Sequence, residues 1–147
     1  MSGCVLDTDI LIAALDRQDA HHTQAANAIK AMIKDGTPLL LSLINYAETL
    51  VRPAEAEDSL ATATNALGAL KLKLIAPTPA IALDAARHRS LRSLNISLAD
   101  AFALATAQAH HATVATFDHR VRRALPKVGL ELTARLAAQE DADTQGR

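Results

Sequence analysis

The sequence predicts a single α/β domain in which helices cover both faces of a mostly parallel β-sheet. Three observations lead to this prediction. Short apolar stretches alternate with longer segments of helical period along the 147 residues. The apolar stretches are hydrophobic at consecutive positions, which is typical of strands buried on both faces. A chain of this length also has room for one hydrophobic core but not comfortably for two.

Four stretches have the composition of buried strands, and a fifth follows near the end of the chain. They are rich in Leu, Val, Ile or Thr and are separated by segments of helical period. Because the connections between them are helical, we expect successive strands to run parallel. The expected strands are Cys4–Leu6, Pro38–Leu41, Leu72–Ile75, Thr113–Thr116 and Val128–Leu132.

Capping residues mark the boundaries of the expected helices. Ser42, Thr78 followed by Pro79, and Ser97 each stand where a helix should begin. Gly36 should end one helix, and Pro53 should close another. In chain order we expect helices beginning near Ile10, from Asp19 to about Asp35, from Leu43 to about Val51, from 54 to 70, from Pro79 to about Leu94, from Ser97 to about His110, and from His119.

Composition indicates an ordinary cytoplasmic protein. No apolar run approaches the roughly 20 residues that cross a bilayer, and the first residues lack the pattern of a signal peptide. The single cysteine, Cys4, cannot form an internal disulfide, which agrees with a reducing compartment. We expect residues 1–135 to form the domain and residues 136–147, which are polar, to form a flexible tail.

The formal net charge of −1 hides an uneven distribution along the chain. Residues 85–127 carry seven Lys and Arg but only two Asp and Glu. Such a basic region can bind a polyanion, or it can be two solvated helix faces, and both interpretations stay open. Its two clusters are Arg87, His88, Arg89 and Arg92, and His119, Arg120, Arg122 and Arg123.

Four carboxylates stand in apolar surroundings. Asp7 and Asp118 follow expected strands, whereas Glu48 and Asp100 are isolated charges within long apolar segments. Parallel strands present their carboxyl ends at one edge of a sheet, so these acids can converge if the first and fourth strands are neighbours. A divalent cation would relieve their mutual repulsion, and oxygen ligands suit Mg²⁺ or Mn²⁺.

Most of these acids also have a local structural explanation. Asp7, Thr8 and Asp9 can cap the helix near Ile10, and Asp118 can cap the helix at His119. Asp100 lies three residues after Ser97, in the arrangement of a capping box. Glu48 has no helix end to cap. Asp9 is expected either to cap a helix or to support the metal ligands without binding the ion.

With these residues in hand, the chain resembles the PIN-domain nucleases, and within them the small VapC-type toxins of bacterial toxin–antitoxin pairs. The resemblance covers residues 4 to about 132 and lies in the order and spacing of the stretches VLDTDILIAAL, SLINYAETL, ISLADAFALATA and VATFDHRV. It implies a three-layer α/β/α fold with strand order 3-2-1-4-5. It also implies catalytic, Mg²⁺- or Mn²⁺-binding roles for Asp7, Glu48, Asp100 and Asp118, supported by Thr8, Thr116 and Asp9.

The resemblance further implies a toxin that is an endoribonuclease, in which the ion activates a water molecule that attacks the phosphodiester bond. Positive side chains must then attract the RNA, and the candidates are Arg87, Arg89, Arg120 and Arg122. The family also implies a homodimer and a VapB-type antitoxin as partner.

Two other interpretations stay open. VLDTD is also the Asp-x-Asp pattern of haloacid-dehalogenase-like phosphatases, with Asp7 as nucleophile and Asp9 as acid, although Ile10 and the lone Asp118 fit that family poorly. Alternatively, the chain is an inactive PIN-like module that only binds RNA or protein.

Overall fold

A parallel sheet of four strands forms the centre of the structure, a computed structural model that describes residues 2–136. The strands are β1 (Cys4–Leu6), β2 (Leu39–Ser42), β3 (Lys73–Ile75) and β4 (Thr113–Ala115). Their order is β3-β2-β1-β4, and all three pairings are parallel. The expected order of the first four strands is therefore confirmed, with β1 and β4 as neighbours.

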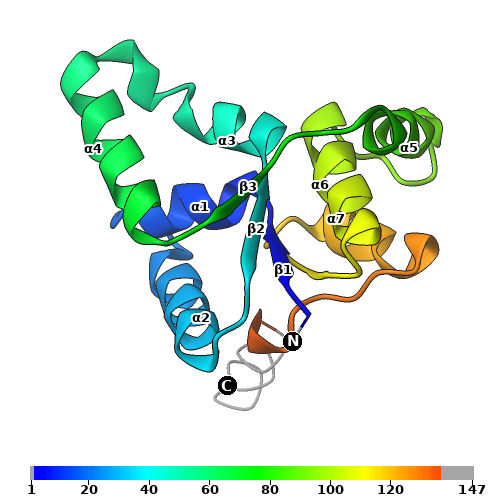
Figure 1. Ribbon diagram of the computed structural model, residues 1–147, viewed down its shortest axis with the longest axis horizontal. Coiled ribbons are helices and arrows are strands. Elements are labelled where there is room, and N and C mark those ends of the chain that lie inside the picture. Colours follow the sequence, from blue (N-terminus) through cyan, green and yellow to red (C-terminus); the bar gives the residue numbers. More distant parts are fainter. Residues whose placement is uncertain (1, 137–147) are drawn as a thin grey trace.

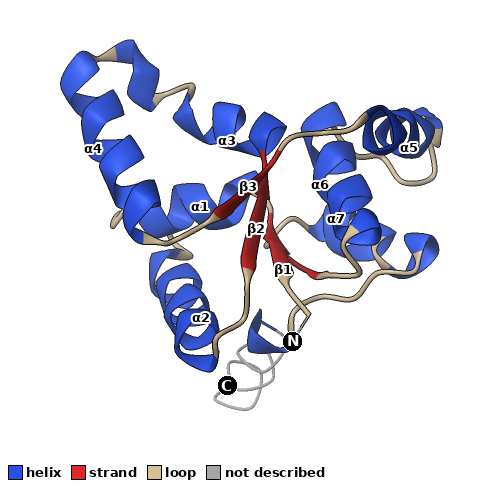
Figure 2. Ribbon diagram, in the orientation of Figure 1, coloured by secondary structure: helices blue, strands red, loops and turns tan. Residues whose placement is uncertain are grey.

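Helices lie on both faces of this sheet, with α1, α2 and α4 to one side in Figure 1 and α5, α6 and α7 to the other. Figure 2 shows the same arrangement by secondary structure. The elements are α1 (Thr8–Leu15), α2 (His22–Asp35), α3 (Leu43–Leu50), α4 (Glu57–Ala69), α5 (Pro79–Ser90), α6 (Leu98–Ala109), α7 (His119–Ala124) and the 3₁₀ helices η1 (Pro53–Glu55) and η2 (Pro126–Val128). The three-layer α/β/α class is confirmed.

The buried core forms two clusters, one on each face of the sheet. Along β1, the side chain of Val5 packs into the cluster that contains α5, α6 and α7, whereas Cys4 and Leu6 pack into the cluster that contains α1 and α2. This alternation follows from the two-residue period of a strand. Both faces are apolar because both are covered, which explains the continuous hydrophobic runs in the sequence.

The predicted helix caps are largely confirmed. The hydroxyls of Ser42, Thr78 and Ser97 accept hydrogen bonds from the first turns of α3, α5 and α6. The carboxylates of Asp7 and Asp118 do the same at α1 and α7. Each cap satisfies a backbone N–H that has no partner inside its own helix.

Three expected boundaries are wrong. The helix α2 begins at His22, because Asp19 closes a turn by accepting hydrogen bonds from the backbone N–H groups of His21 and His22. The helix α4 begins at Glu57, because the preceding Pro53 starts η1. The helix α5 ends at Ser90, where Leu91 turns to an extended backbone.

The prediction of a fifth strand over Val128–Leu132 is also wrong for most of that range. Pro126 starts the 3₁₀ helix η2, and Gly129 follows it with a φ of 75°, so the chain turns where a strand was expected. Within residues 2–136, the segment after η2 pairs with the sheet through an isolated parallel bridge between Leu132 and Val114. The bridge lies beside β4, at the place in the sheet that a fifth strand would take.

Beyond Leu136, the expected polar tail lies outside the described residues. Leu136 itself is buried in the core cluster that contains α1 and α2. Among the helices of residues 2–136, none has the length and apolar character needed to cross a membrane.

Candidate active site

The carboxyl ends of β1 and β4 lie side by side, and an acidic residue follows each of them, Asp7 directly after β1 and Asp118 three residues after the end of β4. Leu6 pairs with Ala115 at the end of the two strands. The next residue after β1 is Asp7, whose backbone N–H donates to the carbonyl of Ala115 at 3.0 Å. Asp118 lies between β4 and α7 and caps α7. The predicted convergence of the acids depended on β1 and β4 being neighbours, and this condition is met.

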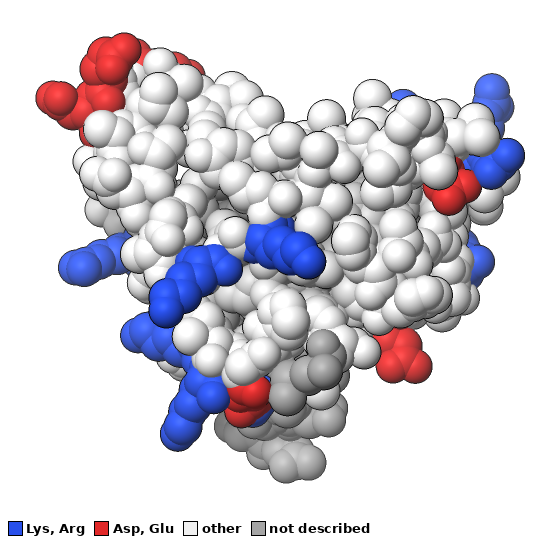
Figure 3. All heavy atoms as spheres, viewed as in Figure 1, with Lys and Arg blue, Asp and Glu red and all other residues white. Residues whose placement is uncertain are grey.

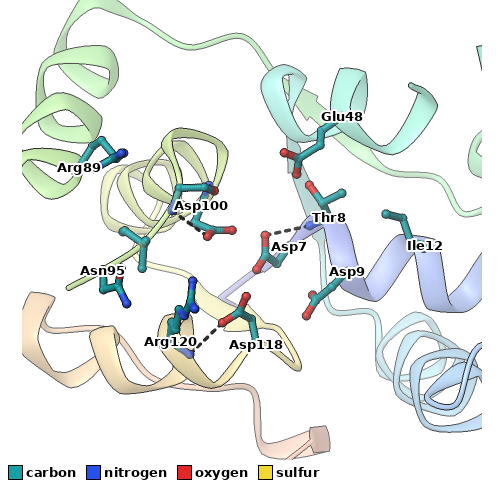
Figure 4. A pocket seen from close by; sticks show the side chains of 12 residues that line it. Asp7, Thr8, Asp9, Ile12, Glu48, Arg89, Asn95, Asp100, Asp118 and Arg120 are labelled. Atoms are coloured by element: carbon teal, nitrogen blue, oxygen red, sulfur yellow. Dashed lines mark hydrogen bonds between the residues drawn. The ribbon is translucent and has the colours of Figure 1, made fainter. Parts of the chain in front are cut away.

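A pocket of about 550 Å³ opens at this edge of the sheet. The carboxylates that Figure 4 shows around it come from the segments after β1 and β4, from the first turns of α1 and α6, and from the helix α3. All four acids expected to bind the ion line the pocket, and so does Asp9. The lining residues are Asp7, Thr8, Asp9, Ile12, Glu48, Arg89, Asn95, Ile96, Ser97, Asp100, Asp118 and Arg120.

Asp7 is the most buried of these acids, with 2% of its surface exposed. Its Oδ1 accepts a hydrogen bond from the backbone N–H of Thr8, and its Oδ2 accepts one from the hydroxyl of Thr116, both at 2.9 Å. Burial raises the pKa of Asp7 to about 8, and the charges of Asp9 and Asp100 add to this increase. Asp7 is thus held in place by the fold and repelled by its neighbours.

Asp100 and Asp118 each combine a helix cap with a position in the pocket. In the capping box of α6, Oδ2 of Asp100 accepts from the backbone N–H of Ser97 at 3.1 Å. Oδ1 of Asp118 accepts from the N–H groups of Arg120 and Val121. Each cap engages one carboxylate oxygen, so capping and a role in the pocket do not exclude each other.

Electrostatic coupling links the remaining acids. Burial raises the pKa of Asp100, and the charges of Asp118 and Glu48 raise it further, against the hydrogen bonds from Ser97. Glu48 lies on α3 and is exposed to solvent. Figure 4 shows its carboxylate entering the pocket from the wall opposite Asp118. Each of the five acids is therefore repelled by the charge of at least one other acid of the same pocket.

Asp9 supports the pocket from α1 and does not cap that helix. Its Oδ2 accepts a hydrogen bond from the backbone N–H of Phe117 at 2.9 Å and lies 3.4 Å from the hydroxyl of Thr116. Burial and the charge of Asp118 raise the pKa of Asp9. The contact with Phe117 ties α1 to the loop that carries Asp118. The Phe117 ring also stacks on His21, with 4.4 Å between ring centroids.

The four candidate RNA-binding arginines separate into two pairs. Arg89 and Arg120 line the pocket. Arg87 instead pairs with Asp84 on its own helix at 2.9 Å, and Arg122 donates from Nε to the backbone carbonyl of Thr116 at 2.9 Å. Charge counted along the chain could not separate these pairs, because neighbouring residues of a helix point in different directions.

Two asparagines that were not predicted from the sequence also lie at the site. Asn95 lines the pocket with a positive φ of 52°, and Asn45 donates hydrogen bonds beneath it to Thr8 and to Ala99. A usable signal for Asn45 was its position as an amide inside the apolar stretch LLLSLINYAETLV. No comparable signal marks Asn95.

A second basic area was also missed. Figure 3 shows positive side chains gathered over α2 and around the start of β3. The exposed lysines of these segments are Lys30 and Lys34 on α2, Lys71 before β3 and Lys73 on β3. These lysines are far apart in the sequence and belong to its net acidic part, so charge counting does not reveal them. They do not line the acidic pocket.

The donor set of the pocket fits a hard divalent cation. Its ionisable acids supply oxygen ligands only, which is the set preferred by Mg²⁺ and Mn²⁺. Within residues 2–136, no three His, Cys, Asp or Glu side chains lie close enough to form a ready-made metal cage. Mg²⁺ does not require one, because it is commonly held by one or two carboxylates together with water and substrate phosphate.

Removing the charge of Asp7 should stabilise the metal-free protein. Because the pKa of Asp7 is raised from 3.8 to about 8, the folded protein keeps a proton that the unfolded chain releases, and stability falls as pH rises between these values. We expect Asp7→Asn to raise the Tm in EDTA at pH 8 by roughly 5 °C, with a much smaller gain at pH 4.5.

Thermal denaturation followed by circular dichroism measures this difference. Asp84→Asn, at a surface aspartate outside the pocket, is the matched control and should show no such dependence on pH. An equal Tm gain for Asp7→Asn at both pH values would contradict the electrostatic explanation.

Comparison with solved structures shows the same fold in bacterial toxin–antitoxin proteins. A VapBC2 structure from Rickettsia felis, bound to a DNA fragment from its promoter, aligns with a TM-score of 0.68 and 17% identity over 88% of this chain and 96% of that one. A toxin–antitoxin complex from Klebsiella pneumoniae aligns with a TM-score of 0.67 and 25% identity, over 84% of this chain and 93% of that one. VapC20 of Mycobacterium tuberculosis is described as a sarcin–ricin loop cleaving toxin. It aligns with a TM-score of 0.64 and 19% identity, over 83% of this chain and 95% of that one.

Sequence comparison gives the family directly. A search of curated proteins gives no significant match. The sequence of residues 4–125, however, matches the PIN domain family, and this region contains every acid of the pocket. The resemblance to VapC-type PIN domains is confirmed by this match together with the structural neighbours. The chain belongs to the PIN domain family.

Proposed function

We propose that this chain is the toxin of a toxin–antitoxin pair and acts in the cytoplasm as a metal-dependent endoribonuclease. The observation that carries the proposal is the convergence of five carboxylates on one pocket at the carboxyl ends of β1 and β4. Membership of the PIN domain family and the likeness to a toxin described as cleaving the sarcin–ricin loop support RNA as the substrate.

Each acid has a proposed role that follows from its position. Asp7, Glu48, Asp100 and Asp118 would hold the ion, and any of them left unprotonated can accept a proton from the attacking water. When bound, Mg²⁺ or Mn²⁺ neutralises charge on the scissile phosphate and makes water a better nucleophile near neutral pH. Thr116 fixes Asp7, and Asp9 fixes the loop before Asp118. Thr8, beside Asp7, supports it through its backbone N–H.

The family match leaves the phosphatase interpretation without support. Asp9, the general acid in that interpretation, lines the pocket and also accepts a hydrogen bond from the backbone N–H of Phe117, so the family match, and not the position of Asp9, disfavours a phosphatase. The inactive binding module differs from the nuclease only in its chemistry, and the cleavage experiment separates the two.

The purified protein should cleave RNA in the presence of Mg²⁺ or Mn²⁺ and should lose this activity in EDTA. Asp7→Asn and Asp100→Asn keep the size of each side chain but remove a charged oxygen, so each should lower the rate by about 100-fold or more. Gel analysis of ribosomal and transfer RNA, with sequencing of the new ends, measures the rate and locates the cleaved bond.

Asp84→Asn is the control for a nonspecific effect of losing one carboxylate and should cleave like the wild type. Equal cleavage by all variants, or cleavage that persists in EDTA, would show that the proposed mechanism is wrong. Binding of RNA without cleavage would favour the inactive module.

Arg89 and Arg120 should attract the RNA backbone to the acidic pocket, because they line it and the acids alone repel phosphate. We expect Arg89→Ala with Arg120→Ala to raise the KM for RNA by roughly 10-fold and to make binding less dependent on salt. The matched control is Lys71→Ala with Lys73→Ala, which removes the same charge away from the pocket. Equal effects of the two pairs would assign the attraction to net charge alone.

A second groove offers a binding surface for a VapB-type antitoxin. It has a volume of about 800 Å³, is bounded by α1, α3, η1 and α4, and is largely apolar. It meets the acidic pocket at Ile12 and Glu48, which line both. An antitoxin segment with an apolar stretch followed by a basic side chain would fill the groove and reach the acids.

Val51→Glu should weaken antitoxin binding by at least about 10-fold without changing RNA cleavage by the free toxin. Val51 lines the groove with 64% of its surface exposed, so a charge there meets the partner and not the core. Ile33→Glu, at an exposed residue of α2 outside the groove, is the control. Calorimetry with a VapB-type antitoxin measures the affinity. If Val51→Glu and Ile33→Glu bind the antitoxin equally well, the antitoxin binds elsewhere.

We also propose that the chain forms a homodimer, as its family implies. The strand β3 is at the edge of the sheet, and Leu74 on that strand is partly exposed. The neighbouring α3 exposes Leu43. An exposed strand edge with apolar side chains is a surface that proteins commonly cover.

A further inference from the structure

Asn45 is a fully buried amide in α3, with 0% of its surface exposed. Burying a carboxamide is unfavourable unless its polar atoms find partners. Helix capping cannot explain the residue, because α3 begins at Leu43 and is capped by Ser42. Asn45 therefore needs a reason that the secondary structure does not supply.

Both hydrogen bonds donated by Asn45 leave its own helix. Nδ2 donates to the hydroxyl of Thr8 on α1 at 3.1 Å and to the backbone carbonyl of Ala99 on α6 at 3.3 Å. A carbonyl can only accept, so the NH₂ group must face Ala99 and the orientation of the amide is determined. These two contacts join α3 to α1 and α6, two of the helices against which it packs.

Each contact lies beside one of the acids assigned to the ion. Thr8 follows Asp7 and donates its backbone N–H to that carboxylate, whereas Ala99 precedes Asp100. Glu48 lies three residues after Asn45, on the same side of α3. One carboxamide thus connects the segments that carry three mutually repelling carboxylates.

The remaining polar atom of Asn45 shows that this arrangement has a cost. Its Oδ1 is buried and has no hydrogen-bond partner among the described residues. A buried acceptor without a partner is uncommon in folded proteins and destabilises them. An apolar residue would avoid this cost, so the two donated bonds are the reason to retain an amide here.

We propose that Asn45 is a positioning residue that sets the spacing of Asp7, Glu48 and Asp100 for the ion. This inference rests on the proposed function. Asn45 does not line the pocket, so its proposed effect on the ion is indirect. It acts through Thr8 and Ala99, which hold the start of α1 and the start of α6 at fixed places relative to α3.

The test compares Mn²⁺ affinity with stability in purified protein. Asn45→Ala should weaken Mn²⁺ binding, measured by calorimetry and by the Mn²⁺ electron paramagnetic resonance signal, by roughly 10-fold or more. Thr106→Val is the matched control, because Thr106 is equally buried but its hydroxyl donates within α6, to the carbonyl of Phe102. The control should lower the Tm and leave Mn²⁺ affinity unchanged.

A second variant covers the case in which Asn45→Ala does not fold. Thr8→Val keeps the shape of the side chain, removes the acceptor of one Asn45 hydrogen bond and leaves the contact with Ala99 in place. It should also weaken Mn²⁺ binding, and in combination with a folded Asn45→Ala the losses should be less than additive.

The outcomes separate this inference from the proposed function. Wild-type affinity in folded Asn45→Ala, or in Thr8→Val if the first variant does not fold, would overturn the positioning role and leave the nuclease proposal intact. Equal losses of affinity in Asn45→Ala and Thr106→Val would also overturn it, because general loosening would then suffice. A wild-type protein that binds no Mn²⁺ would overturn both.

Discussion

The burial of Asp7 where β1 meets β4 is the constraint on which the rest of the site depends. Only 2% of the surface of Asp7 is exposed, and the hydrogen bonds that Thr8 and Thr116 donate to its two oxygens offset part of the cost of burying this carboxylate. These contacts determine where α1 begins and how the chain leaves β4. Asp9 and Asp118 take their positions from the same two segments. The other acids then enter a space whose shape Asp7 has already defined.

The acids are held by the same interactions that build the fold. Asp7, Asp100 and Asp118 all accept hydrogen bonds from helix N-termini, whose partial positive charge lowers the cost of placing several carboxylates together. The remaining repulsion is visible in the raised pKa values of Asp7, Asp9 and Asp100. A pocket of this kind is destabilising when empty of cations, and a bound cation would relieve it. Stability and the proposed chemistry are thus opposed at these residues.

Prediction from the sequence succeeded where local chemistry decides the outcome. The caps at Ser42, Thr78 and Ser97, and the three buried strands that open with Cys4, Leu39 and Thr113, follow from residue type and from runs of apolar side chains. The expected fifth strand failed because Pro126 and Gly129 turn the chain, so that pairing is reduced to a bridge at Leu132. Apolar composition alone cannot show whether a short segment meets a partner strand.

The sequence by itself determined the α/β class, most helix starts, and which acids stand in apolar surroundings, because these depend on neighbours along the chain. The neighbouring positions of β1 and β4 were implied by the family resemblance and not by local patterns. Only the tertiary structure decided that Asp9 reaches Phe117, and that Arg89 faces the pocket while Arg87 pairs with Asp84. Asn45 belongs to the same group, since its partners are 37 and 54 residues away. The physical reason is that side-chain direction and long-range contacts are set by packing, which local sequence patterns do not encode.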